Sequence, residues 1–87
     1  MWVVQFERRA FKDLQRLGTV DQRRVQRFVD ERLTGLDDPR LLGTALTGEL
    51  AGFWRYRVGK IRLITRIDDG KLVVLVVSVG NRREIYR

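Results

Sequence analysis

The sequence has no cysteine and no histidine, and among its 87 residues it has one proline and one methionine. Without cysteine there is no disulfide, no thiol nucleophile and no thiolate metal site. The lack of histidine removes the usual ligand of transition metals and the commonest general acid or base. Any chemistry must therefore use arginine, lysine, tyrosine or carboxylate side chains, and we expect neither a metal nor a cofactor.

Long hydrophobic runs are also lacking. The apolar stretch at residues 1–6 is too short for a signal peptide, and no segment approaches the roughly 20 apolar residues of a membrane span. We therefore expect a cytoplasmic protein with no membrane partner. The length fits a single domain, residues 1–87, and the 44% hydrophobic content exceeds that of disordered chains with similar charge.

Negative charge is scarce in the C-terminal part of the chain. The formal net charge is +7. Residues 1–52 carry nine basic and eight acidic side chains, whereas residues 53–87 carry nine basic and three acidic ones. Such an excess is typical of a phosphate-binding surface, because arginine and lysine displace the counterions of nucleic acids. The alternative is a general bias toward arginine, since the chain has 15 arginines and three lysines.

Apolar residues at three- and four-residue spacing predict two helices. The first covers about residues 7–17, with Gly18 as a candidate C-terminal cap. The second covers about residues 20–34 and begins after Thr19, a candidate N-terminal cap. The short connector makes the pair an antiparallel hairpin. Residues 35–52 hold the proline and four glycines, which predicts an irregular linker.

From residue 53 onward the apolar side chains recur with a period of two, which is typical of strands. Tight turns are expected near Gly59 and at Asp69-Gly70. The expected strands cover residues 1–6, 53–58, 60–67 and 72–79. The order strand, helix, helix, strand, strand, strand predicts an α+β fold, with the helical hairpin packed on one face of a mostly antiparallel four-stranded sheet.

The uncovered face of this sheet is expected to be basic. Arg55, Arg57 and Arg62 fall on positions that would project from it. Trp54 and Tyr56 alternate with the arginines and are therefore expected to pack in the core.

Two motifs near the C-terminus carry a resemblance to a known family. Residues 52–64 read G-F-W-R-Y-R-V-G-K-I-R-L-I, and residues 79–87 read V-G-N-R-R-E-I-Y-R after a valine-rich strand. These motifs closely resemble those of the RelE branch of the RelE/ParE toxins, and the shared order of elements extends the resemblance to nearly the whole chain.

The resemblance implies the toxin of a type II toxin-antitoxin system. It implies a ribosome-dependent endoribonuclease that cleaves mRNA in the ribosomal A site and so inhibits translation. The implied partners are the ribosome, mRNA and a cognate RelB-like antitoxin, which we expect to be acidic and to fold on binding.

The resemblance also assigns roles to individual positions. Arg62 matches the family's third-strand arginine, Arg82 matches the arginine after the V-G turn, and Tyr86 matches the C-terminal tyrosine. These three are the candidate catalytic residues. The candidate RNA-binding residues are Arg55 and Arg57, which stand where the family often has lysines, and Lys60 in the adjacent turn.

The chemistry of these side chains suits metal-free RNA cleavage. A 2′-hydroxyl can attack the neighbouring phosphate and leave a 2′,3′-cyclic phosphate, provided that cations stabilise the phosphorane and protons are transferred. Arginine binds phosphate oxygens well but is a poor base. Tyr86 could act as the base or orient the hydroxyl, or it could stack on an RNA base. For Arg55 and Arg57, a catalytic role and simple phosphate attraction both stay open.

Two other functions fit parts of this pattern. A ParE-like toxin would inhibit DNA gyrase through protein contacts and would not need the arginines and the tyrosine. A non-enzymatic RNA-binding protein would need basic charge, but no fixed geometry around Tyr86. The combination of arginines with a tyrosine favours the nuclease.

Overall fold

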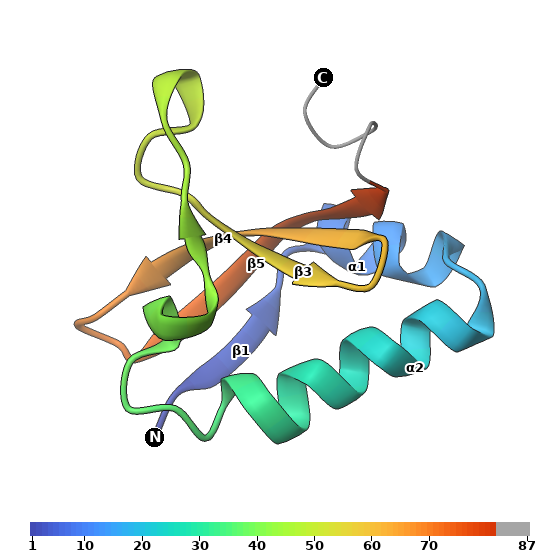
Figure 1. Ribbon diagram of the computed structural model, residues 1–87, viewed down its shortest axis with the longest axis horizontal. Coiled ribbons are helices and arrows are strands. Elements are labelled where there is room, and N and C mark those ends of the chain that lie inside the picture. Colours follow the sequence, from blue (N-terminus) through green and yellow to red (C-terminus); the bar gives the residue numbers. More distant parts are fainter. Residues whose placement is uncertain (82–87) are drawn as a thin grey trace.

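The structure, a computed structural model, describes residues 1–81 and combines two helices with one sheet (Figure 1). This confirms the predicted α+β class. The elements in chain order are β1 (Val3–Phe6), α1 (Arg8–Arg16), α2 (Thr19–Phe28), a π-helical turn (Val29–Leu33), a 3-10 turn (Pro39–Leu42), β2 (Thr44–Ala45), a second 3-10 turn (Gly48–Leu50), β3 (Trp54–Val58), β4 (Ile61–Asp68) and β5 (Val73–Asn81).

The sheet has five strands in the order β1-β5-β4-β3-β2. As predicted, it is mostly antiparallel, and β1 runs parallel to β5. The predicted number of four strands is wrong, because Thr44 and Ala45 form a short edge strand against Arg55 and Trp54. Two residues inside a glycine-rich linker are too few to show a period of two, so the pattern of the sequence could not reveal β2.

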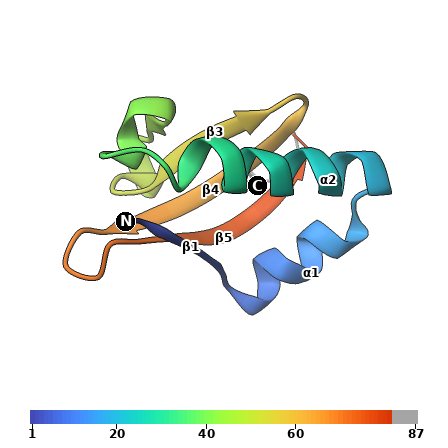
Figure 2. The same cartoon turned by 90° about the horizontal axis from the view of Figure 1, so that it is seen from below.

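Both helices pack on the same face of the sheet, as Figure 2 shows from below. The predicted helical hairpin is confirmed, although Gly18 is the extended residue before α2 and Thr19 is the first residue inside it. The core combines residues of α1, of α2 with its π-helical turn, and of the sheet, including Ala10, Leu14, Val25, Val29, Leu33, Tyr56, Leu63, Val74 and Val76.

The two hairpins of the sheet have different turns. Gly59 and Lys60 join β3 to β4, and the φ of +61° at Gly59 fits a type II′ turn, which takes glycine at its first central position. The predicted hairpin at Asp69-Gly70 forms too, but four residues separate β4 from β5. Leu72, the last of these four, has a φ of 55°.

The N-terminal half of β5 and its C-terminal half have different neighbours. β1 pairs with Val73 to Val76 and then ends. Beyond that point, α1 lies beside the rest of β5 (Figure 1). The amide of Glu7 donates to the carbonyl of Val76 at 2.9 Å, and the amide of Val79 donates to Oδ2 of Asp13 on α1 at 3.3 Å. Asp13 therefore attaches α1 to the strand where β1 no longer reaches.

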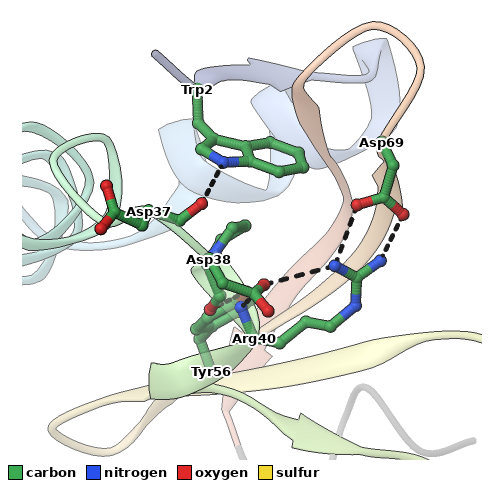
Figure 3. A network of polar contacts seen from close by, with 7 residues as sticks. Trp2, Asp37, Asp38, Arg40, Tyr56 and Asp69 are labelled. Atoms are coloured by element: carbon green, nitrogen blue, oxygen red, sulfur yellow. Dashed lines mark hydrogen bonds and ion pairs between the residues drawn. The ribbon is translucent and has the colours of Figure 1, made fainter.

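Polar contacts fasten the linker to the end of the sheet (Figure 3). Arg40 donates to both carboxylate oxygens of Asp69, at 3.0 and 2.7 Å, and one of its nitrogens also reaches Asp38 at 3.3 Å. The hydrogen bonds from Arg40 lower the pKa of Asp69. Trp2 donates to the carbonyl of Asp37 at 2.9 Å. These contacts fix the path of the linker before it enters β2.

No helix within the described part of the chain has the length and apolar character needed to cross a membrane.

Candidate active site

The register of β3 against β4 brings two arginines together. Arg57 on β3 lies directly opposite Arg62 on β4, and Arg62 in turn lies opposite Gly80 on β5. Tyr56 and Leu63, which flank these positions in sequence, belong to the core under the helices. Because successive side chains of a strand point to opposite faces, the two arginines lie on the uncovered face of the sheet, as predicted.

The environment of the two guanidinium groups suits an anion. Arg62 is only 5% exposed, whereas Arg57 is exposed. Like charges placed directly opposite each other on a sheet repel, and phosphate groups bound at these positions would replace that repulsion with charge-assisted contacts. Gly80, which lies opposite Arg62 on β5, contributes no side chain to this face.

The other candidate residues are placed less centrally. Arg55 is half-buried, opposite Ile64, on the same face as Arg57. Lys60 lies in the β3–β4 turn, where its side chain is 71% exposed and its ammonium is 3.9 Å from a carboxylate oxygen of Asp21 on α2. The structure thus directs Lys60 toward the helical layer and away from the arginine pair. Arg82 and Tyr86 lie outside the described residues, so their roles remain predictions.

Tyr56 is a tyrosine close to the site in sequence, but it serves the core. Its side chain has no exposed surface, and its hydroxyl donates to the carbonyl of Pro39 at 2.8 Å. Burial raises its pKa to about 12. A phenol that holds its proton this tightly and faces the helices cannot serve the uncovered face, which confirms the prediction that Tyr56 is a packing residue.

Arg66 extends the basic surface and was not singled out from the sequence. It is exposed on β4, four residues after Arg62, and it lines two shallow hollows of the uncovered face. One hollow also contains Gln5 and Leu75, and the other contains Phe53. The period of two that placed Arg62 on this face could have identified Arg66 as well.

The described residues supply cations rather than metal ligands. Within residues 1–81, no group of three or more carboxylates is arranged to hold a metal ion. The arginines can stabilise the extra negative charge of a pentacoordinate phosphorus, and their planar donors can fix the orientation of a phosphodiester. Proton transfer would need a further group, because an arginine hardly ever loses its proton.

Comparisons with known proteins identify the family of the chain. Residues 4–86 match the family model described as ParE toxin of type II toxin-antitoxin system, parDE. The chain is 35% identical to "Toxin RelG" of Mycobacterium tuberculosis, over 99% of this chain and 97% of the relative. It is 30% identical to "mRNA interferase toxin RelE" of Escherichia coli, over 98% of this chain and 90% of the relative.

Solved structures give the same result for the fold. The toxin-antitoxin complex RelBE2 of Mycobacterium tuberculosis aligns with a TM-score of 0.84 at 33% identity, over 93% of this chain and 98% of that chain. The isolated RelE toxin of Escherichia coli aligns with a TM-score of 0.72 at 26% identity, over 99% and 92% of the two chains. The chain therefore belongs to the RelE/ParE family, as a toxin of a type II toxin-antitoxin system of the RelBE kind.

Proposed function

We propose that this toxin is a metal-independent endoribonuclease that cleaves mRNA in the A site of the ribosome. The observation that carries the proposal is the placement of Arg57 directly opposite Arg62 on the uncovered face. A toxin that acted only through protein contacts would have no need for a pair of cations so close together. The relative in Escherichia coli is named an mRNA interferase, which supports the same activity.

The proposed reaction is a transesterification within the RNA. The 2′-hydroxyl attacks the adjacent phosphorus, the bond to the 5′-oxygen breaks, and the products carry a 2′,3′-cyclic phosphate and a 5′-hydroxyl. Arg62, with Arg82, stabilises the charge on the phosphorane, while Arg55 and Arg57 hold the flanking phosphates. The proton of the attacking hydroxyl goes to a base, and the departing 5′-oxygen takes up a proton.

Tyr86 is the candidate for the base, or for a platform on which an RNA base stacks. The variant Tyr86→Phe separates these roles, because it removes the hydroxyl and keeps the ring. A slow Tyr86→Phe variant supports proton transfer, whereas a loss confined to Tyr86→Ala supports stacking.

The proposed partners are the ribosome and an antitoxin encoded with the toxin. Relatives have been solved as RelBE complexes, among them the RelE-RelB complex of Pyrococcus horikoshii. For this chain we propose an acidic, RelB-like segment that folds on the toxin and covers its basic face. We therefore propose a cytoplasmic location, where ribosomes and a co-expressed antitoxin would meet the toxin.

The decisive experiment adds the purified chain to a translating extract and maps the ends of the RNA. We expect cuts linked to codons in messages that ribosomes are translating, and a strong loss of these cuts in Arg62→Ala. Arg23→Ala, an exposed arginine on α2, is the control for the loss of one charge. Cuts in free RNA would contradict the need for a ribosome. Intact message together with blocked DNA supercoiling would instead establish the gyrase inhibitor.

A further inference from the structure

The first helix carries a row of cations on one side. Arg8, Arg9, Lys12 and Arg16 are all exposed, and with 3.6 residues per turn they fall within about 100° of arc. The buried residues Ala10 and Leu14 lie on the opposite side of α1. We call Arg8, Arg9, Lys12 and Arg16 the α1 basic row.

The distribution of charge along the sequence does not reveal this row, because residues 1–52 are nearly neutral as a whole. In space, the groove along α1 is lined by the four cations and by Asp13 alone among acidic residues. The side chain of Asp13 is only 17% exposed, and one of its oxygens accepts from the amide of Val79. Its other oxygen lies 3.8 Å from the guanidinium of Arg16, so Asp13 offsets the charge of Arg16 but pairs with none of Arg8, Arg9 and Lys12. The α1 basic row is therefore a separate concentration of positive charge.

The row is continuous with the uncovered face at both ends. Arg9 lines the same hollow as Arg66 and Ser78. Arg16 lines a second hollow with Gly80 and Asn81, next to the position of Arg62. Each hollow also contains one acidic residue, Glu7 in the first and Asp13 in the second. A polyanion lying over the arginine pair can thus reach the cations of α1 directly from the uncovered face.

We propose that the α1 basic row binds the phosphate backbone of RNA outside the segment that is cleaved. This inference rests on the proposed function, which it extends from the cleavage site to a larger RNA-binding surface. All five residues lining the groove are charged, and a protein interface normally has an apolar centre with few charges. A backbone of phosphates needs only the cations, which span about 12 Å along the helix. The phosphates could belong to the message or to folded ribosomal RNA.

The test measures binding of the full chain to RNA that it cannot cut. The probes are a fluorescein-labelled RNA hairpin and a single-stranded RNA oligonucleotide, both 2′-O-methylated, so that no 2′-hydroxyl can attack. The row variant is Arg8→Gln, Arg9→Gln and Lys12→Gln. The matched control, called the α2 control, removes the same charge from the exposed side of α2 and its π-helical turn with Arg23→Gln, Arg27→Gln and Arg32→Gln.

Each phosphate contact contributes about 0.7 to 0.9 to the slope of log affinity against log salt. We expect the row variant to lower the magnitude of this slope by about two, and the α2 control to lower it by less than one. An effect on the hairpin assigns the phosphates to folded RNA, and an effect on the oligonucleotide alone assigns them to the message. Either result supports the proposal, whether or not the chain cleaves RNA.

Equal changes in the two variants would overturn the proposal, since net charge alone would then explain binding. Unchanged RNA binding in the row variant would also overturn it, and weaker capture of an acidic antitoxin peptide in that variant would assign the row to protein recognition. Arg8→Lys with Arg9→Lys keeps the charges and is expected to retain the slope. A thermal melt of each variant verifies that its fold is intact.

Discussion

Arg62 is the residue on which the proposed chemistry depends most. It is almost fully buried although it lies on the uncovered face, and its neighbour across the strand pair is a second arginine. A guanidinium in this position is surrounded by protein on most sides, where its interaction with a phosphate is screened less than in water. We therefore expect Arg62 to act on the transition state more than on binding.

Replacing Arg62 by alanine is expected to lower the single-turnover rate of mRNA cleavage on programmed ribosomes by about two to three orders of magnitude, since one preorganised donor is typically worth that much. Arg62→Lys keeps the charge but loses the planar pair of donors, so we expect a smaller loss. The control Arg23→Ala is expected to stay within about twofold of the parent. A parental rate for Arg62→Ala would contradict this role.

The ionisation of Tyr56 is expected to make the stability of the fold depend on pH in the alkaline range. Burial raises the pKa of its phenol to about 12 from a reference value of 10.0. The resulting stabilisation is fully present below pH 10 and is lost as the pH rises toward 12. We expect the stability advantage of the parent over Tyr56→Phe, measured by urea unfolding, to shrink above pH 10 by up to roughly 2 kcal/mol. A difference that does not change with pH would show that the phenol is not protected.

Gly43 lies against the ring of Tyr56. A Cβ added at Gly43 would come within 3.1 Å of the Cζ of Tyr56 and 3.3 Å of the Cε3 of Trp54. We expect Gly43→Ala to cost about 1 to 3 kcal/mol, which is measurable as a lower melting temperature. Gly35→Ala is the control, because nothing lies within 4 Å of its added Cβ. Equal melting temperatures for the two variants would mean that the linker moves freely away from the ring.

At the residue level, the sequence identified the alternation of Arg55 and Arg57 with Tyr56 correctly, because a period of two fixes the face of each side chain. It could not show that Arg62 is buried, since burial depends on the neighbouring strands. The alternation also could not predict that the side chain of Lys60 lies near Asp21, because Asp21 belongs to a helix far away in sequence.

At the level of elements, the attachment of α1 to β5 depends on Asp13. The carboxylate replaces the strand neighbour that the amide of Val79 lacks once β1 has ended. Its position also determines where the α1 basic row lies relative to the uncovered face.

We expect Asp13→Ala to lower the free energy of unfolding by about 1 to 2 kcal/mol, because the partly buried amide of Val79 loses its acceptor. Asp13→Asn keeps an acceptor oxygen and is expected to lose less. Hydrogen exchange of the Val79 amide, followed by NMR, gives the local readout. Unchanged protection in Asp13→Ala would show that the carboxylate is not what attaches α1 at this point.

Most helices and strands were predictable, and the exceptions have physical causes. The two helices and the three long strands each show enough repeats of their period to be recognised. Along β5 the period fails, because Thr65 pairs with Val76 while Ile64 pairs with Ser78, which leaves Val77 as an extra residue. Because of this bulge, the core residue that follows Val76 is Val79 and not Ser78, and no feature of a nearly all-apolar run indicates such a shift.

At the level of the whole molecule, the net charge of +7 should govern the encounter with an acidic antitoxin. We expect its association rate, measured by stopped flow, to fall by about tenfold or more as salt rises from low to physiological concentration. The dissociation rate is expected to change much less, because apolar contacts are not screened. An association rate that is insensitive to salt would show that the antitoxin first meets another part of the toxin.

The topology of the sheet also affects how the toxin is made. β1 is among the first segments to leave the ribosome, whereas its partner β5 is among the last. Arg62 on β4 also needs β5 beside it, because it lies opposite Gly80. While the C-terminal segment is still inside the exit tunnel, the sheet cannot close, and the nascent chain has no finished active face. Under the proposed function, the ribosome that synthesises the toxin would therefore be protected from its product while β5 is still inside the tunnel.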